Sequence, residues 1–196
     1  MLTTNEKKIL RLLAASQTDY SINGISKECH ITPNGTYKIL SKLEKEGILK
    51  SKKIANIKSY TLNFNSPKTA RVLELAFIPS EVKDKIKSRS ADVTRLKSLT
   101  KVCVLFGSYI TSKKNPKDLD ILFVLEKKNY MEFTRLLEKV KEVVPIMVHD
   151  ILQTPEDLKS NLKKSDPIII AALRQGIVLW GFETIVGVIA HAQRKD

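Results

Sequence analysis

The chain has 196 residues and carries 34 Lys and Arg against 21 Asp and Glu, which gives a formal net charge of +13. Apolar residues make up 42% of the chain and charged residues 28%, a balance that is ordinary for globular proteins and excludes wholesale disorder and fibrous structure. No apolar run reaches the ~18 residues of a membrane helix, and the N-terminal residues lack the apolar core of a signal peptide, so we expect a cytoplasmic protein.

Both halves of the chain are basic. Residues 1–79 have a formal charge of +7, and residues 80–196 have one of +6. A basic surface attracts polyanions such as nucleic acid, nucleotides or anionic lipid. The alternative is that the excess charge serves solubility alone, so the positions of the basic residues must distinguish these two interpretations.

Cysteine and histidine give no sign of a disulfide framework or of a structural zinc site. The chain holds two cysteines, Cys29 and Cys103, too few for such a framework. Its three histidines are scattered without the spacing of zinc ligands: His30, His149 and His191. We therefore predict no structural zinc.

The first 64 residues predict three helices followed by a β-hairpin. Apolar residues recur at helical spacing in two segments before residue 30. Thr32 is suited to cap a third helix, and Pro33 takes the first helical position, where its missing N–H group costs nothing. Two short strands then follow, around a turn at Ala55 and Asn56.

This order resembles a winged helix-turn-helix domain over residues 4–64. The third helix buries one apolar face and leaves a polar, Lys-rich face outward, while the hairpin adds further lysines. Short polar side chains at a helix N-terminus reach base edges, and lysines meet phosphates. We therefore predict contacts with double-stranded DNA from Asn34, Thr36, Lys38, Ser41, Lys42, Lys52 and Lys53. The alternatives are a solvated lysine face or a module that docks protein or RNA. Because winged-helix regulators commonly bind palindromic DNA sequences as dimers, we also expect a homodimer.

The second half contains two acidic residues at the head of an apolar strand. A buried strand from Val102 ends at Gly107 and Ser108, and a second one begins with Asp118 and Asp120. Residues two apart in a strand face the same side, so the two carboxylates point together and repel each other. A divalent cation relieves this repulsion, and carboxylate oxygens suit Mg²⁺.

A third carboxylate is predicted from a neighbouring strand. Asp150 is the lone acid among apolar residues, and it shares a strand face with Val148 and Leu152. Gly107 lets the backbone approach a phosphate closely, and Ser108 and nearby N–H groups can bond its oxygens. The alternative is that the paired aspartates only begin a strand beside surface lysines.

These motifs together resemble the nucleotidyltransferase fold of the DNA polymerase β superfamily, over roughly residues 85–182. The resemblance implies that Asp118, Asp120 and Asp150 hold two Mg²⁺ ions and that Asp150 activates an acceptor hydroxyl. It also implies that a nucleoside triphosphate is the substrate. The Gly-Ser bend and the loop lysines would hold the triphosphate: Gly107, Ser108, Lys113, Lys114 and Lys117. Nine residues, Tyr109 to Lys117, separate the two motifs, a shorter spacing than is usual in that family.

We therefore predict an α+β protein in which a winged helix-turn-helix precedes a nucleotidyltransferase-like mixed sheet packed with helices. The predicted divisions are residues 1–66, a linker at 67–80, and residues 81–196. The predicted activity is transfer of a nucleoside monophosphate to an acceptor. Resemblance to minimal nucleotidyltransferases implies an antitoxin role, with a HEPN-type protein as partner. The alternative is a non-catalytic transcriptional regulator with a nucleotide-sensing or assembly domain.

Overall fold

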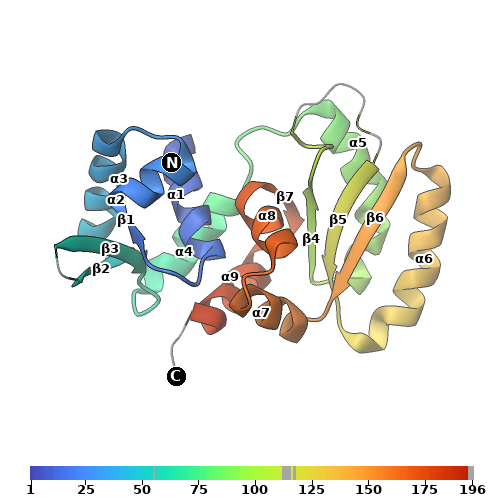
Figure 1. Cartoon of the computed structure of the whole chain (residues 1–196). Helices are drawn as coiled ribbons and strands as arrows, with labels where there is room; N and C mark the ends of the chain where they lie inside the picture. The colour runs from blue at the N-terminus through green and yellow to red at the C-terminus, as the bar shows by residue number, and fades with distance from the viewer. Residues whose placement is uncertain (55, 112–115, 117, 194–196) are drawn as a thin grey trace.

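The structure is a computed structural model that describes residues 1–54, 56–111, 116 and 118–193. Its N-terminal half is a small helical unit with a three-stranded antiparallel sheet of order β1-β3-β2, drawn in blue to green in Figure 1. The elements of this half are α1 (Thr4–Ala15), β1 (Tyr20–Ser21), α2 (Ile22–Cys29), α3 (Pro33–Lys45), β2 (Leu49–Ile54) and β3 (Ile57–Leu62). This order confirms the predicted three helices and hairpin; Ala55, at the predicted turn, lies outside the described residues.

Local sequence explains where the first helices begin. Thr3 and Glu6 form a reciprocal capping box at the start of α1, each side chain bonding the other's backbone N–H. The side chain of Thr32 accepts a hydrogen bond from the N–H group of Gly35, so Thr32 caps α3 as predicted. Beyond the end of α3, Gly47 has a φ of 76°, a left-handed conformation that glycine adopts without strain.

The segment predicted as a linker is largely helical. Helix α4 (Pro67–Phe77) fills most of residues 67–80 and buries Leu73, Ala76 and Phe77. It packs against α1 on one side and against the C-terminal helix α9 (Phe182–Gln193) on the other. The connection between the halves is therefore part of the packed core.

The second half is built on a four-stranded mixed sheet of order β6-β5-β4-β7. Strand β4 pairs antiparallel with both β5 and β7, while β5 and β6 run parallel. The strands are β4 (Val102–Phe106), β5 (Asp118–Val124), β6 (Met147–Gln153) and β7 (Ile177–Trp180). The helices are α5 (Asp84–Val93), α6 (Tyr130–Val143), α7 (Pro155–Lys163), α8 (Pro167–Gln175) and α9, with 3₁₀ turns at Thr94–Leu99 and Lys127–Asn129. A mixed sheet packed with helices is therefore confirmed.

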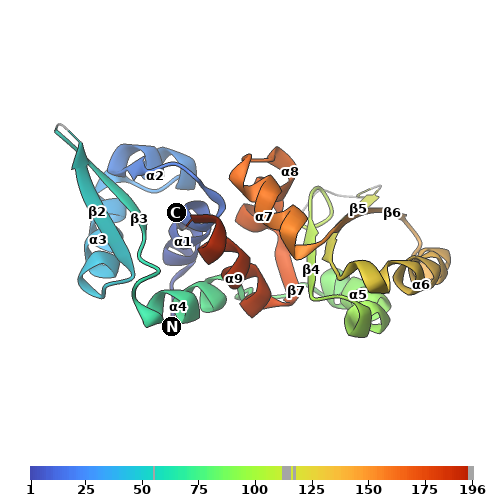
Figure 2. The ribbon, with the colours of Figure 1, turned by 90° about the horizontal axis from the view of Figure 1, so that it is seen from below.

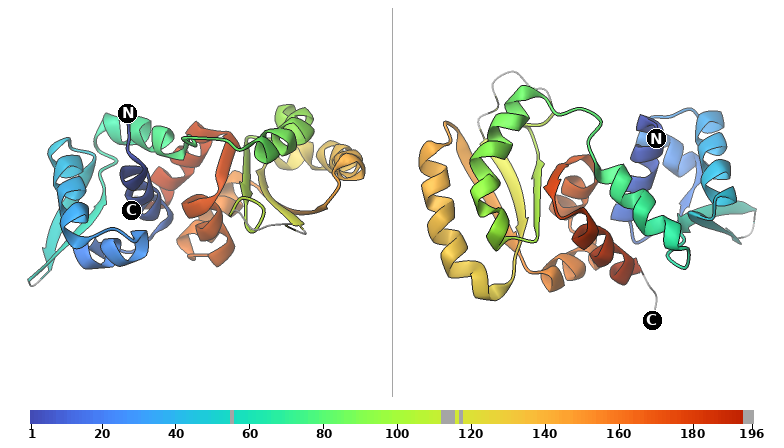
Figure 3. Two further views of the ribbon diagram at one scale, coloured as in Figure 1. Left: turned by 90° about the horizontal axis from the view of Figure 1, so that it is seen from above. Right: turned by 180° about the vertical axis from the view of Figure 1, so that it is seen from behind.

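Helices cover the two faces of this sheet unequally. The face that carries Val104 and Leu122 packs against α7, α8 and α9, which lie between the sheet and the N-terminal half (Figure 2). The opposite face, which carries Leu105 and Ile121, packs against α5 and α6, as the view from behind in Figure 3 shows. In the described residues, no helix is both long and apolar enough to cross a membrane.

The two halves share one continuous apolar core, which runs from α1 and α4 through α7 to α9 onto the sheet. Polar contacts reinforce it. The guanidinium group of Arg11 donates to the carbonyl oxygens of Leu173 (2.9 Å) and Gly176 (2.6 Å) and lies 5.1 Å from the ring of Phe77. The amide of Gln193 donates to three carbonyl oxygens at the end of α1 and just beyond it. The two halves are thus joined by both apolar packing and hydrogen bonds.

Candidate functional site

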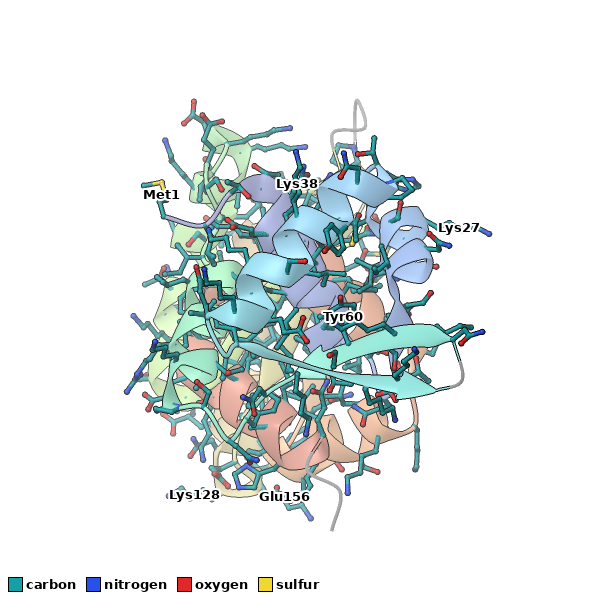
Figure 4. The ribbon with its side chains drawn as sticks, turned by 90° about the vertical axis from the view of Figure 1, so that its left-hand side faces the viewer. Met1, Lys27, Lys38, Tyr60, Lys128 and Glu156 are labelled. Carbon is teal, nitrogen blue, oxygen red and sulfur yellow. The ribbon has the colours of Figure 1, made fainter. Side chains whose placement is uncertain are left out.

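Helix α3 presents one continuous polar stripe to solvent. Asn34, Lys38, Ser41 and Lys45 recur at intervals of four, three and four residues, which places them on one side of a helix. Figure 4 views the molecule from this side, with α3 across the front and the β2–β3 hairpin below it. Ser41 is half-buried and the other three are exposed; beside them lies Tyr37, whose side chain is 54% exposed. Tyr37 and Lys45 thus lie on the same exposed surface as Asn34 and Lys38.

Thr36 is not part of this stripe, so its predicted contact with DNA is wrong. The residue is 0% exposed and lies on the same helical side as the buried Leu40 and Leu43, four and seven positions further along. Its hydroxyl has no hydrogen-bond partner among the described residues. Two residues on from Asn34, the chain has turned by about 200° around the helix axis, which directs Thr36 into the core.

Two of the predicted DNA-contacting lysines bind carboxylates of the protein itself. The Nζ atom of Lys42 lies 2.7 Å from Oε1 of Glu6 on α1, and this hydrogen bond raises the pKa of Lys42. Lys52 forms an ion pair with Asp19. All three lysines are exposed, and no ion pair joins Lys53 to another of the described residues. Carboxylates of the protein therefore partly neutralise the charges of Lys42 and Lys52.

The hairpin is tied to α3 by one carboxylate. Oε2 of Glu44 accepts from Nζ of Lys58 (2.7 Å), and Oε1 accepts from the hydroxyl of Ser51 (2.5 Å). The hydrogen bonds from Lys58 and then Ser51 lower the pKa of Glu44. Glu44 on α3 therefore faces the hairpin and links the two elements.

In the second half, two carboxylates and an imidazole meet on the face of the mixed sheet that also carries Leu122. Nδ1 of His149 lies 3.5 Å from Oδ1 of Asp120 and 3.8 Å from Oδ2 of Asp118. The strand register explains this arrangement, because Asp120 pairs with His149 across the parallel β5–β6 ladder. The site lies where β4 ends and β5 and β6 begin, at the top of the sheet in Figure 1.

The predicted Gly-Ser bend lies directly against these aspartates. Ser108 donates a hydrogen bond to Oδ1 of Asp118 (2.9 Å). Gly107 has a φ of 74°, and a Cβ atom there would come within 1.9 Å of Oδ2 of Asp120. Tyr109 is buried in the apolar cluster between the sheet and helices α5 and α6. Its hydroxyl donates a hydrogen bond to the carbonyl oxygen of Lys85 (3.2 Å), which anchors the bend. Gly107 is therefore required both by its conformation and by its neighbour.

Asp150 does not join this site, and its predicted role as a metal ligand and catalytic residue is wrong. It pairs with Ile121, which lies on the opposite face of β5 from Asp118 and Asp120. Its Oδ1 instead lies 2.9 Å from Nζ of Lys141 on α6, the helix that covers that face. Adjacent residues of a strand point to opposite faces, so His149, the neighbour of Asp150, occupies the position beside Asp118 and Asp120 that was expected for Asp150. The sequence pattern did not predict His149 at this site.

The residues present do not fit the predicted centre, in which three carboxylates would hold two Mg²⁺ ions. Among the described residues, the set that could hold a metal is Asp118, Asp120 and His149. Mg²⁺ favours oxygen ligands, and one of these three offers nitrogen instead. The predicted phosphate contacts Lys113, Lys114 and Lys117 lie outside the described residues. We therefore derive no catalytic step through a pair of magnesium ions.

Comparison with known proteins bears on the N-terminal half. Residues 2–50 match the family model described as winged helix-turn-helix DNA-binding. No curated protein and no solved structure matches the chain. The matched residues contain α1, α2, α3 and the first residues of β2, the same elements that form the exposed stripe and its support. Residues 2–50 of this chain are therefore similar to a winged helix-turn-helix DNA-binding domain.

Proposed function

We propose that the protein is a DNA-binding transcriptional regulator whose second half binds a ligand without turning it over. The observation that carries this proposal is the exposed stripe of α3: Asn34, Tyr37, Lys38, Ser41 and Lys45. Asn34 lies in the first turn of the helix, where a side chain can reach a base edge in the major groove. Lys38 and Lys45, further along, suit phosphates, and so does Lys53 in the hairpin.

The second half supports regulation better than catalysis. The third carboxylate predicted for a transferase is turned away, so Asp118 and Asp120 lack the partner that would complete such a centre. The shared core and the contacts of Arg11 and Gln193 join this half to α1, the helix that supports α3. A structural change caused by a ligand in the second half would therefore be transmitted to the DNA-binding domain through these contacts.

Selection from a pool of random DNA duplexes with the full-length protein tests this function. We expect enrichment of a short sequence, and of a palindrome if the protein binds as a homodimer. Asn34→Ala should relax the preference at one base pair, because a good base contact contributes about 1–3 kcal/mol of discrimination. Recovery of an unenriched pool would contradict sequence-specific regulation.

Nucleotidyl transfer is a second candidate, favoured by the contacts of the Gly-Ser bend. Ser108 and Gly107 each lie against one of the two aspartates, an arrangement that brings the bend and the paired carboxylates together. Such a site suits a nucleotide phosphate bound beside a metal. The acceptor would be a protein hydroxyl, and a HEPN-type partner is the candidate that the family resemblance implies.

Label transfer separates the two candidates. The full-length protein is incubated with a labelled nucleoside triphosphate, a divalent metal and the protein encoded beside it. A transferase would label that acceptor, and Asp118→Asn with Asp120→Asn would abolish the label, while Asp150→Asn would keep it. The regulator predicts no labelled product from any of these proteins, although nucleotide binding by calorimetry is compatible with it.

A further inference from the structure

The cluster formed by Asp118, Asp120 and His149 has the dimensions of a site for one metal ion. Each residue offers one ligand atom, and the three atoms lie within 4.8 Å of one another. Two ligands bound at about 2.1 Å from one ion are separated by about 3.0 Å in octahedral and about 3.4 Å in tetrahedral geometry. The observed separations of 3.5 and 3.8 Å from Nδ1 of His149 need only small side-chain movements to reach these values.

Both carboxylates are oriented toward the imidazole. Oδ1 of Asp118 is held by the hydroxyl of Ser108, and its other oxygen faces His149. Oδ2 of Asp120 lies against Gly107, and its other oxygen again faces His149. The Gly-Ser bend thus fixes the outer oxygen of each carboxylate and leaves the inner oxygens to converge on one point.

The imidazole is also placed to act as a ligand through Nδ1. Its Nε2 atom lies 3.0 Å from the thioether sulfur of Met147, a weak hydrogen-bond acceptor. In the tautomer that would bind a metal, the proton of Nε2 faces this sulfur and the lone pair of Nδ1 faces the space between the two carboxylates. His149 is 50% exposed, so an ion can reach the cluster from solvent.

We propose that this cluster binds a single first-row transition-metal dication, with His149 as the third protein ligand, in preference to Mg²⁺. Imidazole nitrogen suits Zn²⁺, Co²⁺, Ni²⁺ and Fe²⁺, whereas Mg²⁺ favours octahedral oxygen. The third carboxylate that would favour Mg²⁺ is absent from this face, because Asp150 is paired with Lys141 on the other. This inference stands apart from the DNA-binding function, so failure of either leaves the other intact.

Titration of the full-length protein with Co²⁺ tests the proposal, since the visible absorption of this ion reports its ligands. We expect one Co²⁺ per chain, with tighter binding than Mg²⁺ measured by calorimetry in the same buffer. His149→Ala should shift the absorption band and weaken Co²⁺ binding at least tenfold, roughly the effect of losing even an outer partner of a metal ligand. Ser108→Ala should weaken binding by roughly 10–100-fold, because Ser108 orients Asp118.

Asp150→Asn is the matched control, one residue further along the same strand. It should leave the Co²⁺ spectrum and affinity unchanged, and thermal unfolding without metal should show that each variant is folded. The proposal is overturned if folded His149→Ala retains the wild-type spectrum and affinity. It is also overturned if Mg²⁺ binds as tightly as Co²⁺, or if Asp150→Asn loses the site as His149→Ala does.

Discussion

His149 and Asp150 are neighbours in β6, and their side chains lie on opposite faces of the sheet. The imidazole of His149 lies 3.5 Å from the carboxylate of Asp120, while Asp150 forms an ion pair with Lys141 on α6. The parallel register of β5 and β6 produces this separation. It converts an expected set of three carboxylates into two carboxylates and an imidazole, and so changes which chemistry the second half can perform.

Gly107→Ala should destabilise the protein by at least about 1–2 kcal/mol, the cost of a left-handed conformation for an L-residue. The new Cβ atom would also lie 1.9 Å from Oδ2 of Asp120 and force that carboxylate to move. Urea denaturation followed by circular dichroism measures the change. Gly187→Ala in α9 is the control: a Cβ atom there meets nothing within 4 Å, so this substitution should stabilise the helix by about 0.5–1 kcal/mol. Equal stability of the Gly107 variant and wild type would contradict the close contact.

Arg11→Met should destabilise the junction between the two halves by about 1–3 kcal/mol, because two carbonyl oxygens lose a charged donor. Burial lowers the pKa of the Arg11 guanidinium to about 10, which shows how far this charge is removed from water. Arg71→Met removes an exposed arginine whose partner, among the described residues, is Glu74 of the same helix, so its effect should stay within about 0.5 kcal/mol. Thermal unfolding of the two variants gives the comparison, and equal losses would argue against a structural role for Arg11.

Glu6 should contribute to stability at neutral pH and lose that contribution in acid. Burial raises the pKa of this carboxyl, but the hydrogen bonds from Lys42 and Thr3 outweigh burial and lower it below the ordinary 4.5. The unfolded chain therefore takes up the proton first as the pH falls, and stability declines from about pH 4.5 downward through the lowered pKa of the folded state. Glu6→Gln should show a smaller loss of melting temperature between neutral pH and about pH 3. An identical pH profile for both proteins would contradict the assignment.

Local patterns in the sequence predicted much of the fold, because each depends on a few neighbouring residues. Thr32 and Pro33 start α3 as expected, and the hairpin follows. The strand that ends at Gly107 and the strand that begins at Asp118 are both present. Such local patterns could not predict the continuous core. The packing of α9 against α4, for example, depends on contacts between residues far apart in the chain.

The errors at the candidate sites have physical causes that a single sequence hides. Strand alternation correctly grouped Asp150 with Val148 and Leu152, but it does not say which face of the sheet receives that group; the register with β5 decides this. Similarly, helical spacing from Leu40 and Leu43 places Thr36 on the buried side of α3. This spacing could have been read from the sequence. The pairing of Lys42 with Glu6 joins two helices and needed the tertiary structure.

The salt dependence of duplex binding, measured by fluorescence anisotropy, tests the DNA-binding function most directly. The affinity of the full-length protein should fall steeply with salt, with a logarithmic slope of about −0.9 for each phosphate neutralised. Lys38→Ala with Lys45→Ala should weaken binding and reduce the magnitude of that slope by about 2. Lys139→Ala, an exposed lysine on α6 at the opposite end of the molecule (Figure 1), should leave both unchanged. A flat salt dependence, or equal effects of the α3 and α6 substitutions, would contradict DNA recognition by this helix.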